Sequence, residues 1–380
     1  MTDSKTLGLY LHIPFCRSRC HYCGFYSVGS KLTDSFLDAL AQEMENKSKL
    51  FEDKLCDTVY LGGGTPSVLS GNQLKSIIEA LHRYFHIYEN AEITMEMNPI
   101  DMTEEYLLSI YQLGINRISV GVQTRDNHML SFLGRNHSSA SAAQSIKRAY
   151  QIGFHNISID LMYELPGQTC IDFKNSLLWA VHLPITHLSV YSLIIEKGTR
   201  FWQLMERGLL QRPTESESWN MYQAMCRILP HYGFHRYEIS SFARKNYESK
   251  HNLKYWYMDD YIGFGPSACS RLGTQRIEVV PGIRQYITEL LKDRQPPMEI
   301  INLSESEDME EYCFLHLRMK EGFDREDFYS RYGSYPETWY KKEIAILKDK
   351  NLLIEKDGHI QMTAKGAALG NFVFEKFLRS

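Results

Sequence analysis

The sequence has 380 residues, 43% of them hydrophobic, and a formal net charge of −4. A chain of this length can bury a large core, and we expect two or three domains. The charge gives no general attraction to nucleic acid or to an anionic membrane. Because the first residues are polar and no apolar run reaches membrane-spanning length, we expect neither a signal peptide nor a transmembrane segment.

The first half of the chain alternates strand-like and helix-like segments. An apolar run at 7–13 predicts a buried strand, which Pro14 ends. Five more strands are predicted at 58–61, 92–97, 117–122, 156–162 and 187–193, with helix-like segments between them. This alternation predicts an α/β fold in which a parallel sheet curls into a partial (β/α)6 barrel. Functional groups of such folds gather at the carboxyl ends of the strands.

The second half has a different character. A helix is expected at 215–229, followed by a Tyr- and Asn-rich stretch at 240–270 that shows little periodicity. Near the end, Asp357-Gly358 predicts the turn of a hairpin within 352–362. We therefore expect three domains: a partial barrel at 1–235, a segment packing on the barrel at 236–300, and a winged-helix-like α+β module at 301–380.

Three cysteines follow the first predicted strand on one loop: Cys16, Cys20 and Cys23. Thiolates bind both Fe–S clusters and zinc. Zinc would need a fourth protein ligand, and His21 is a poor candidate because adjacent Cys20 and His21 cannot easily point at one ion. A disulfide plus a spare thiol is a third interpretation, but the other five cysteines are scattered, as in a reduced cytoplasmic protein. A [4Fe–4S] cluster with one open iron fits three cysteines best.

Other candidate ligand-binding groups lie at the ends of later strands. The glycines of Leu61-Gly-Gly-Gly-Thr-Pro66 let the backbone approach a ligand closely, although a tight turn would need them as well. Glu96 ends the third strand, where a carboxylate can bond ribose hydroxyls or face solvent. Asp160 lies in the fifth strand, where an unpaired buried charge would be costly, so a ligand or an arginine such as Arg117 must satisfy it.

The cysteine spacing and the glycine-rich turn together resemble the radical S-adenosylmethionine (SAM) superfamily. In that family the amino and carboxylate groups of SAM chelate the open iron of a [4Fe–4S] cluster. The resemblance implies SAM contacts from Tyr10, Gly63, Gly64, Thr65, Glu96, Gln123, Arg135 and Asp160.

Longer runs narrow the resemblance to the oxygen-independent coproporphyrinogen III oxidase group and, within it, to the HemW-type heme chaperones. These runs are 10–16, 121–137, 165–169, 191–196, 233–240, 251–256 and 260–265. Two departures argue against a true oxidase: Phe25 takes the place of that enzyme's further cysteine, and the arm before Tyr10 is short. The resemblance implies a chaperone that carries the cluster and SAM and passes heme to acceptor proteins. The alternative is a radical SAM enzyme acting on a porphyrin or its precursor, so whether the chain is an enzyme stays open.

The motif His251-Asn-Leu-Lys-Tyr-Trp256 implies heme contacts from His251, Tyr255 and Trp256. Heme iron accepts an imidazole nitrogen, and porphyrin faces favour aromatic side chains. The alternative is an aromatic loop that packs on the barrel with a satisfied histidine. Cys269 stands where relatives more often have a histidine, so a ligand role there is in doubt.

The C-terminal module suggests DNA binding by its expected fold, but its charge argues against that function. Residues 301–380 contain 12 Lys and Arg against 15 Asp and Glu, a balance of −3. A phosphate-binding face usually needs clustered positive charge. We interpret the module as a lid or docking surface and expect no nucleic-acid partner; peripheral contact with a membrane is left open.

Overall fold

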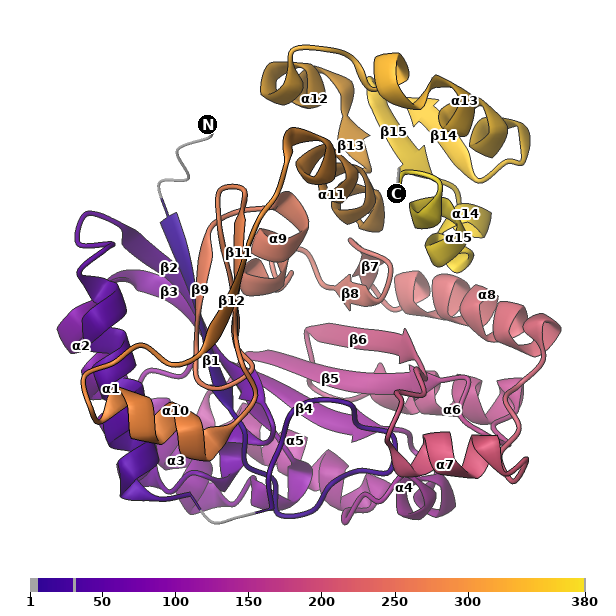
Figure 1. Cartoon of the computed structure of the whole chain (residues 1–380). Coiled ribbons are helices and arrows are strands. Elements are labelled where there is room, and N and C mark those ends of the chain that lie inside the picture. Colours follow the sequence, from indigo (N-terminus) through magenta and orange to yellow (C-terminus); the bar gives the residue numbers. More distant parts are fainter. Residues whose placement is uncertain (1–5, 30–31, 379–380) are drawn as a thin grey trace.

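The structure, a computed structural model, describes residues 6–29 and 32–378. Within these residues, a mixed sheet of 12 strands runs in the order β12-β11-β10-β9-β1-β2-β3-β4-β5-β6-β8-β7 (Figure 1). Its parallel centre consists of β1 (Thr6–Ile13), β2 (Leu55–Gly63), β3 (His86–Met97), β4 (Arg117–Gln123), β5 (Asn156–Tyr163) and β6 (His187–Ser192). The prediction of successive parallel strands is confirmed, because each of these strands pairs in parallel with the next.

Helices cover the outer face of this curled sheet (Figure 1). They are α1 (Asp34–Ser48), α2 (Gly71–Tyr84), α3 (Glu104–Gln112), α5 (Ser139–Ile152), α6 (Cys170–Ala180) and α8 (Glu215–His231). The short helices α4 (Asn127–Phe132) and α7 (Arg200–Glu206) lie beside the loop that follows β1, and 3-10 turns lie at Pro66–Val68 and Pro99–Asp101. Alternate strand residues such as Leu9, Leu11 and Ile13 are fully buried in the main hydrophobic core. Their neighbours Tyr10 and His12 contact each other on the other side of β1, inside the barrel. The barrel interior is therefore polar and aromatic.

The segment 236–300 contributes strands to both edges of the sheet. They are β7 (His235–Arg236), β8 (Ser241–Ala243), β9 (Tyr261–Phe264), β10 (Cys269–Leu272), β11 (Gln275–Val279) and β12 (Met298–Asn302), with helices α9 (Lys250–Tyr257) and α10 (Ile283–Leu290) between them. β9 pairs in parallel with β1, and β8 pairs antiparallel with β6. The stretch at 240–270, which shows little periodicity in the sequence, thus contains two strands, a helix and the start of a third strand.

The C-terminal part is a separate α+β layer. It contains α11 (Glu305–Arg318), β13 (Phe323–Asp324), α12 (Arg325–Tyr332), α13 (Pro336–Asp349), β14 (Leu353–Lys356), β15 (His359–Met362), α14 (Ala364–Ala368) and α15 (Gly370–Glu375). The predicted hairpin is confirmed: β14 pairs antiparallel with β15, and both turn residues, Asp357 and Gly358, have positive φ.

The two ends of the barrel meet different parts of the chain. In Figure 1 the cysteine loop, in indigo, lies close to α4 and α7, and the C-terminal layer lies at the opposite end beside α9. No helix among the described residues is long and apolar enough to cross a bilayer.

Candidate functional site

The three cysteines of the loop after β1 face one cavity of about 230 Å³. All three thiols are partly buried and none is in a disulfide. Hydrogen bonds between Cys16 and Val28 (3.1 Å) and between Val28 and Pro14 (2.7 Å) close the loop at its base. The loop therefore holds its thiols at the carboxyl end of the barrel, where ligands of such folds bind.

The spread of these thiols bears on the kind of metal they can bind. In the part of the chain that the structure describes, no three His, Cys, Asp or Glu side chains converge where one metal ion could bind. A [4Fe–4S] cluster makes a different demand, since each thiolate binds its own iron. The donor set of three thiols around one cavity fits such a cluster.

The glycine-rich turn at the end of β2 lies directly against the cysteine loop. Gly63 has φ +101°, and a Cβ on it would lie 2.6 Å from the His12 imidazole; a Cβ on Gly64 would lie 2.7 Å from the Ile13 carbonyl oxygen. The Gly64 and Thr65 amides donate to the carbonyls of Ile13 (2.9 Å) and Phe15 (2.8 Å). Only glycine fits here, so the turn keeps its backbone exposed to the cavity beside the thiols.

Arg135 links the thiols to the neighbouring strand ends. Its guanidinium donates to Cys20 Sγ (3.3 Å), to Asn98 Oδ1 (2.7 Å) and to the Gly121 carbonyl. Asn98 in turn donates to Thr65 Oγ1 (3.3 Å), which lies 3.4 Å from Cys16 Sγ. A fixed cation beside a thiol favours its thiolate form, which is the form that binds iron.

Two carboxylates form the floor of the cavity. Glu96 accepts hydrogen bonds from the Tyr60 hydroxyl (2.8 Å) and the Gly63 amide (3.2 Å), and burial raises its pKa to about 7. Asp160 accepts a hydrogen bond from Ser119 (3.4 Å), and burial raises its pKa to about 6. Burial makes both carboxylates costly to ionise, and cationic or hydroxyl groups of a ligand would stabilise their ionised forms.

Most residues implied for SAM line this cavity, but one does not. Gly63, Gly64, Thr65, Glu96, Gln123, Arg135 and Asp160 all line it. Tyr10 is not in the lining: its ring lies 6.2 Å from that of Tyr60, and its hydroxyl bonds His12 Nδ1 (3.1 Å). Tyr22, Asn98, Ser119 and Tyr191 line the cavity without having been singled out. Their position at strand ends or beside a cysteine was the available signal.

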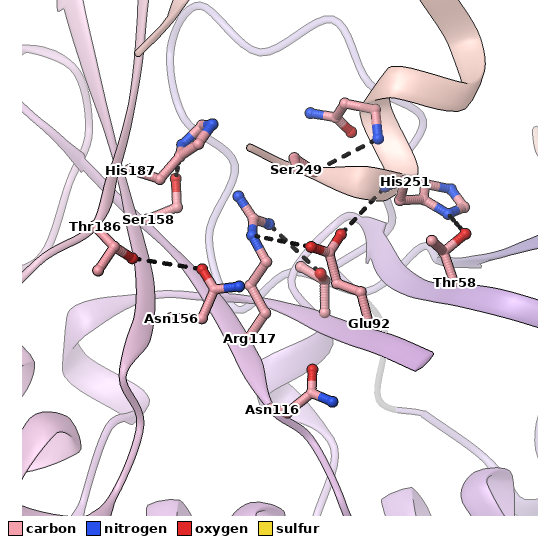
Figure 2. Close-up of polar contacts among 12 residues, drawn as sticks. Thr58, Glu92, Asn116, Arg117, Asn156, Ser158, Thr186, His187, Ser249 and His251 are labelled. Atoms are coloured by element: carbon pink, nitrogen blue, oxygen red, sulfur yellow. Dashed lines mark hydrogen bonds and ion pairs between the residues drawn. The ribbon is translucent and has the colours of Figure 1, made fainter. Parts of the chain in front are cut away.

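At the other end of the barrel, α9 carries the motif that implies heme contacts (Figure 2). His251 is fully buried; its Nδ1 bonds Thr58 Oγ1 (2.9 Å) and its Nε2 bonds the Tyr255 hydroxyl (2.8 Å). Burial lowers its pKa to about 3, so the imidazole is neutral. Both ring nitrogens are occupied, as the satisfied-histidine alternative requires, so heme could reach His251 only if α9 moved.

The start of α9 is held by a buried ion pair (Figure 2). The backbone amide of His251 donates to Glu92 Oε1 (3.1 Å), which suits a carboxylate at a helix N-terminus. Glu92 also lies 4.0 Å from the Arg117 guanidinium, and both side chains are buried. Arg117 is thus the partner of Glu92 rather than a direct ion-pair partner of Glu96 or Asp160.

Tyr255 and Lys254 also face the barrel, whereas Trp256 and the following Tyr257 face the C-terminal layer. Arg318 of α11 stacks over the Trp256 ring at 4.2 Å, and the Tyr257 hydroxyl donates to Glu321 (2.6 Å). Cys269, on β10, is exposed rather than buried. The helix α9 therefore lies between the barrel and α11.

Comparison with known proteins gave matches along the whole chain. The model of the radical SAM superfamily matches residues 10–180, and that of the HemN C-terminal domain matches residues 303–369. The heme chaperone HemW of Bacillus subtilis (strain 168) is 37% identical over 97% of this chain and 98% of its own length. HemW of Lactococcus lactis subsp. lactis (strain IL1403) is also 37% identical, over 98% of both chains. The solved structure of the Escherichia coli radical SAM enzyme coproporphyrinogen III oxidase (HemN) superposes with a TM-score of 0.85, 23% identity, and coverage of 98% of this chain and 90% of that one.

Proposed function

Because the chain belongs to the radical SAM superfamily, in the oxygen-independent coproporphyrinogen III oxidase-like group close to the HemW heme chaperones, we propose that it is a heme chaperone. In this proposal it carries a [4Fe–4S] cluster and SAM and passes heme to acceptor proteins. The observation that carries it is the 37% identity to proteins named heme chaperones, which extends over 97% of this chain.

The cluster would be held by Cys16, Cys20 and Cys23. Support comes from their common cavity and from the Arg135 guanidinium, 3.3 Å from Cys20 Sγ. When bound, such a cluster supplies an open iron and one electron at a time. The chain's own contribution is to place the three thiols around one cavity, with the glycine turn and Thr65 beside them.

SAM would lie in the same cavity, against Gly63, Gly64, Thr65, Glu96, Gln123, Arg135 and Asp160. The open backbone of the glycine turn suits the methionyl end of SAM, and Glu96 suits the ribose hydroxyls. Tyr10 lies behind Tyr60, so in this proposal it acts on the cavity only through its neighbours.

Heme would be taken up by His251, Tyr255 and Trp256 after α9 has moved. A neutral imidazole is the form that binds iron, and burial keeps His251 neutral. Heme acceptors are protein partners whose identity stays open. The cytoplasm is the proposed compartment, because the scattered thiols require reducing conditions.

A radical SAM enzyme acting on a porphyrin precursor is the competing function, since the chain shares its fold with the E. coli oxidase. Phe25 argues against it: this side chain is 68% exposed at the cavity mouth, where the oxidase pattern has a further cysteine.

The two functions separate in an anaerobic experiment on the reconstituted protein. One arm titrates heme by absorbance, and the other incubates the reduced protein with coproporphyrinogen III and SAM and analyses the products. We expect near-stoichiometric heme binding with a Soret band, transfer of heme to an apo-acceptor, and no protoporphyrinogen IX. Robust conversion without saturable heme binding would establish the oxidase instead.

The cluster is tested in the same preparations by replacing single cysteines. Cys20→Ala should lose the brown chromophore and most bound iron, whereas Cys269→Ala, an exposed thiol outside the loop, should keep both. Equal iron content in the two variants would refute the assignment of the cluster ligands.

A further inference from the structure

Tyr60, on β2, contacts both Glu96, which lines the cavity, and His251 of α9, and no motif pointed to it. Its hydroxyl donates to Glu96 Oε1 (2.8 Å), on the cavity floor. Its ring stacks on the His251 imidazole, with ring centroids 5.2 Å apart and planes inclined by 27°. One side chain therefore bridges the carboxylate proposed for SAM and the histidine proposed for heme.

The stack is one of several contacts that keep His251 in place. Tyr255 bonds its Nε2. Thr58 bonds its Nδ1 and Glu92 accepts from its backbone amide (Figure 2). Tyr60 differs from these three because its own position depends on Glu96, which lines the cavity. A ligand in the cavity can therefore act on His251 through Tyr60 without touching α9.

Glu96 already accepts one hydrogen bond on each oxygen, on Oε1 from Tyr60 and on Oε2 from the Gly63 amide. Each carboxylate oxygen has two lone pairs, so ribose hydroxyls can also donate to Glu96. A hydroxyl that donates to Oε1 shares this oxygen with Tyr60 and weakens the bond that fixes the Tyr60 ring. We expect Tyr60 to shift as a result, and its stack on His251 to weaken.

From this arrangement we infer that Tyr60 is a positioning residue that couples the two sites: SAM, by engaging Glu96, loosens the hold on His251 and strengthens heme binding. The inference rests on the proposed function, because it needs both ligands to bind. Coupling between sites is reciprocal, so heme must strengthen SAM binding by the same factor.

The test is a set of heme titrations of the reconstituted protein with and without saturating SAM. The cluster is kept oxidised so that no electron is available to cleave SAM. We expect SAM to lower the Kd for heme at least about fivefold, the lower end of typical couplings. In Tyr60→Phe the ring keeps its size, but the hydroxyl bond to Glu96 that fixes the ring is gone, so the ring can shift away from His251 without SAM. The ratio should fall to near one, with the SAM-free Kd already close to the tighter value.

The matched control is Tyr261→Phe, which removes the hydroxyl of another buried tyrosine. Tyr261 packs on Tyr255 (ring centroids 4.6 Å apart) and lies on β9, away from Glu96. This variant should keep the parental ratio. The parent protein alone supplies a second measure, since saturating heme must lower the Kd for SAM by the same factor.

The outcomes separate this inference from the function on which it rests. If the parent binds both ligands but shows no coupling, or if Tyr60→Phe keeps the coupling, the inference is wrong and the chaperone function stands. If the parent fails to bind one of the ligands, the proposed function is wrong and the inference falls with it.

Discussion

At the scale of single residues, burial sets the charge of the groups on the cavity floor. Glu96 and Asp160 have raised pKa values, chiefly because both carboxyls are buried. The nearest cations act from a distance: Arg117 and Arg135 both lower the pKa of Asp160. Such a floor is incomplete without a ligand that donates hydrogen bonds or carries positive charge.

This chemistry predicts how SAM affinity depends on pH. Burial raises the pKa of Glu96 to about 7, and ribose hydroxyls prefer its ionised form as acceptor. Protonation below pH 7 therefore competes with binding, so the Kd for SAM should rise up to about tenfold as the pH falls from 8 to 6. Asp160 adds to the same trend mainly below pH 6.

Calorimetric titration of the reconstituted protein at several pH values measures this dependence. Glu96→Gln should bind SAM more weakly at pH 8 and show a flatter profile between pH 6 and pH 8. An unchanged profile in Glu96→Gln would mean that another group controls the pH dependence.

The sequence patterns predicted which residues line the cavity better than they predicted what each residue contacts. The cysteines, the glycine turn and Glu96 were identifiable because each follows or ends a strand, and parallel strands bring such ends together. Asp160 was identifiable as a charged residue within a predicted buried strand. Tyr10 and Tyr60 alternate with core residues inside the barrel, where a sequence does not reveal which ring faces the ligand. Their contacts depend on the curl of the sheet.

At the scale of elements, α9 shows why the second half was hard to predict. Ser249 caps the helix by accepting from the Asn252 amide, and Met258 ends it with a left-handed conformation (φ 60°). Both faces of α9 contact protein, since Lys254 pairs with buried and partly buried groups of β1 and β2, and Trp256 meets α11. A short helix held on two sides lacks the single apolar stripe that periodicity detects.

The hydrogen bond between His251 and Thr58 predicts how a substitution in β2 affects the docking of α9. Thr58→Val keeps the volume of the side chain but leaves His251 Nδ1 without its partner. Loss of one buried hydrogen bond should weaken the docking of α9 by about 1–3 kcal/mol. Hydrogen exchange of the α9 amides should accelerate accordingly, and heme should bind more tightly, because less of its binding free energy is spent on displacing α9.

Two other variants complete this test. Thr124→Val removes another buried threonine hydroxyl, which bonds Ser176 far along the chain, and should leave exchange in α9 unchanged. His251→Ala should weaken heme binding or shift the Soret band. If His251→Ala has the parental spectrum and affinity, heme is bound elsewhere and the opening of α9 is irrelevant to it.

At the scale of the molecule, the second half of the chain adds strands to both edges of the parallel sheet that the first half forms. Six βα units predicted the parallel centre, but the short strands β8 and β9, of three and four residues, gave no alternating pattern from which pairing could be read. Their positions depend on long-range pairing, because β8 pairs with β6 and β9 pairs with β1. The same closure brings α9 against the barrel and beneath the C-terminal layer (Figure 1).

The C-terminal layer is attached through a buried arginine of β10. Arg271 is 2% exposed and its guanidinium pairs with Asp308 and Glu311 of α11, each at 2.6 Å. Glu311 has a second charged partner in Arg276. Asp308 accepts its other hydrogen bond from the neutral Tyr332 hydroxyl (2.8 Å). Removal of Arg271 therefore leaves the buried Asp308 without a counter-charge.

Arg271→Met should consequently lower the stability of the whole molecule. Breaking a buried ion pair on one side typically costs about 3–5 kcal/mol, whereas exposed pairs contribute about 0–1 kcal/mol. The matched control is Glu355→Gln, which removes a carboxylate paired with Lys348 and Arg325 at the surface of the same layer. The double variant Arg271→Met with Asp308→Asn keeps an acceptor for Tyr332 and removes the stranded charge, so it should recover most of the loss. Denaturant unfolding followed by circular dichroism compares the four proteins. If Arg271→Met costs no more than Glu355→Gln, or if the double variant is as unstable as Arg271→Met, packing rather than this ion pair holds the C-terminal layer on the barrel.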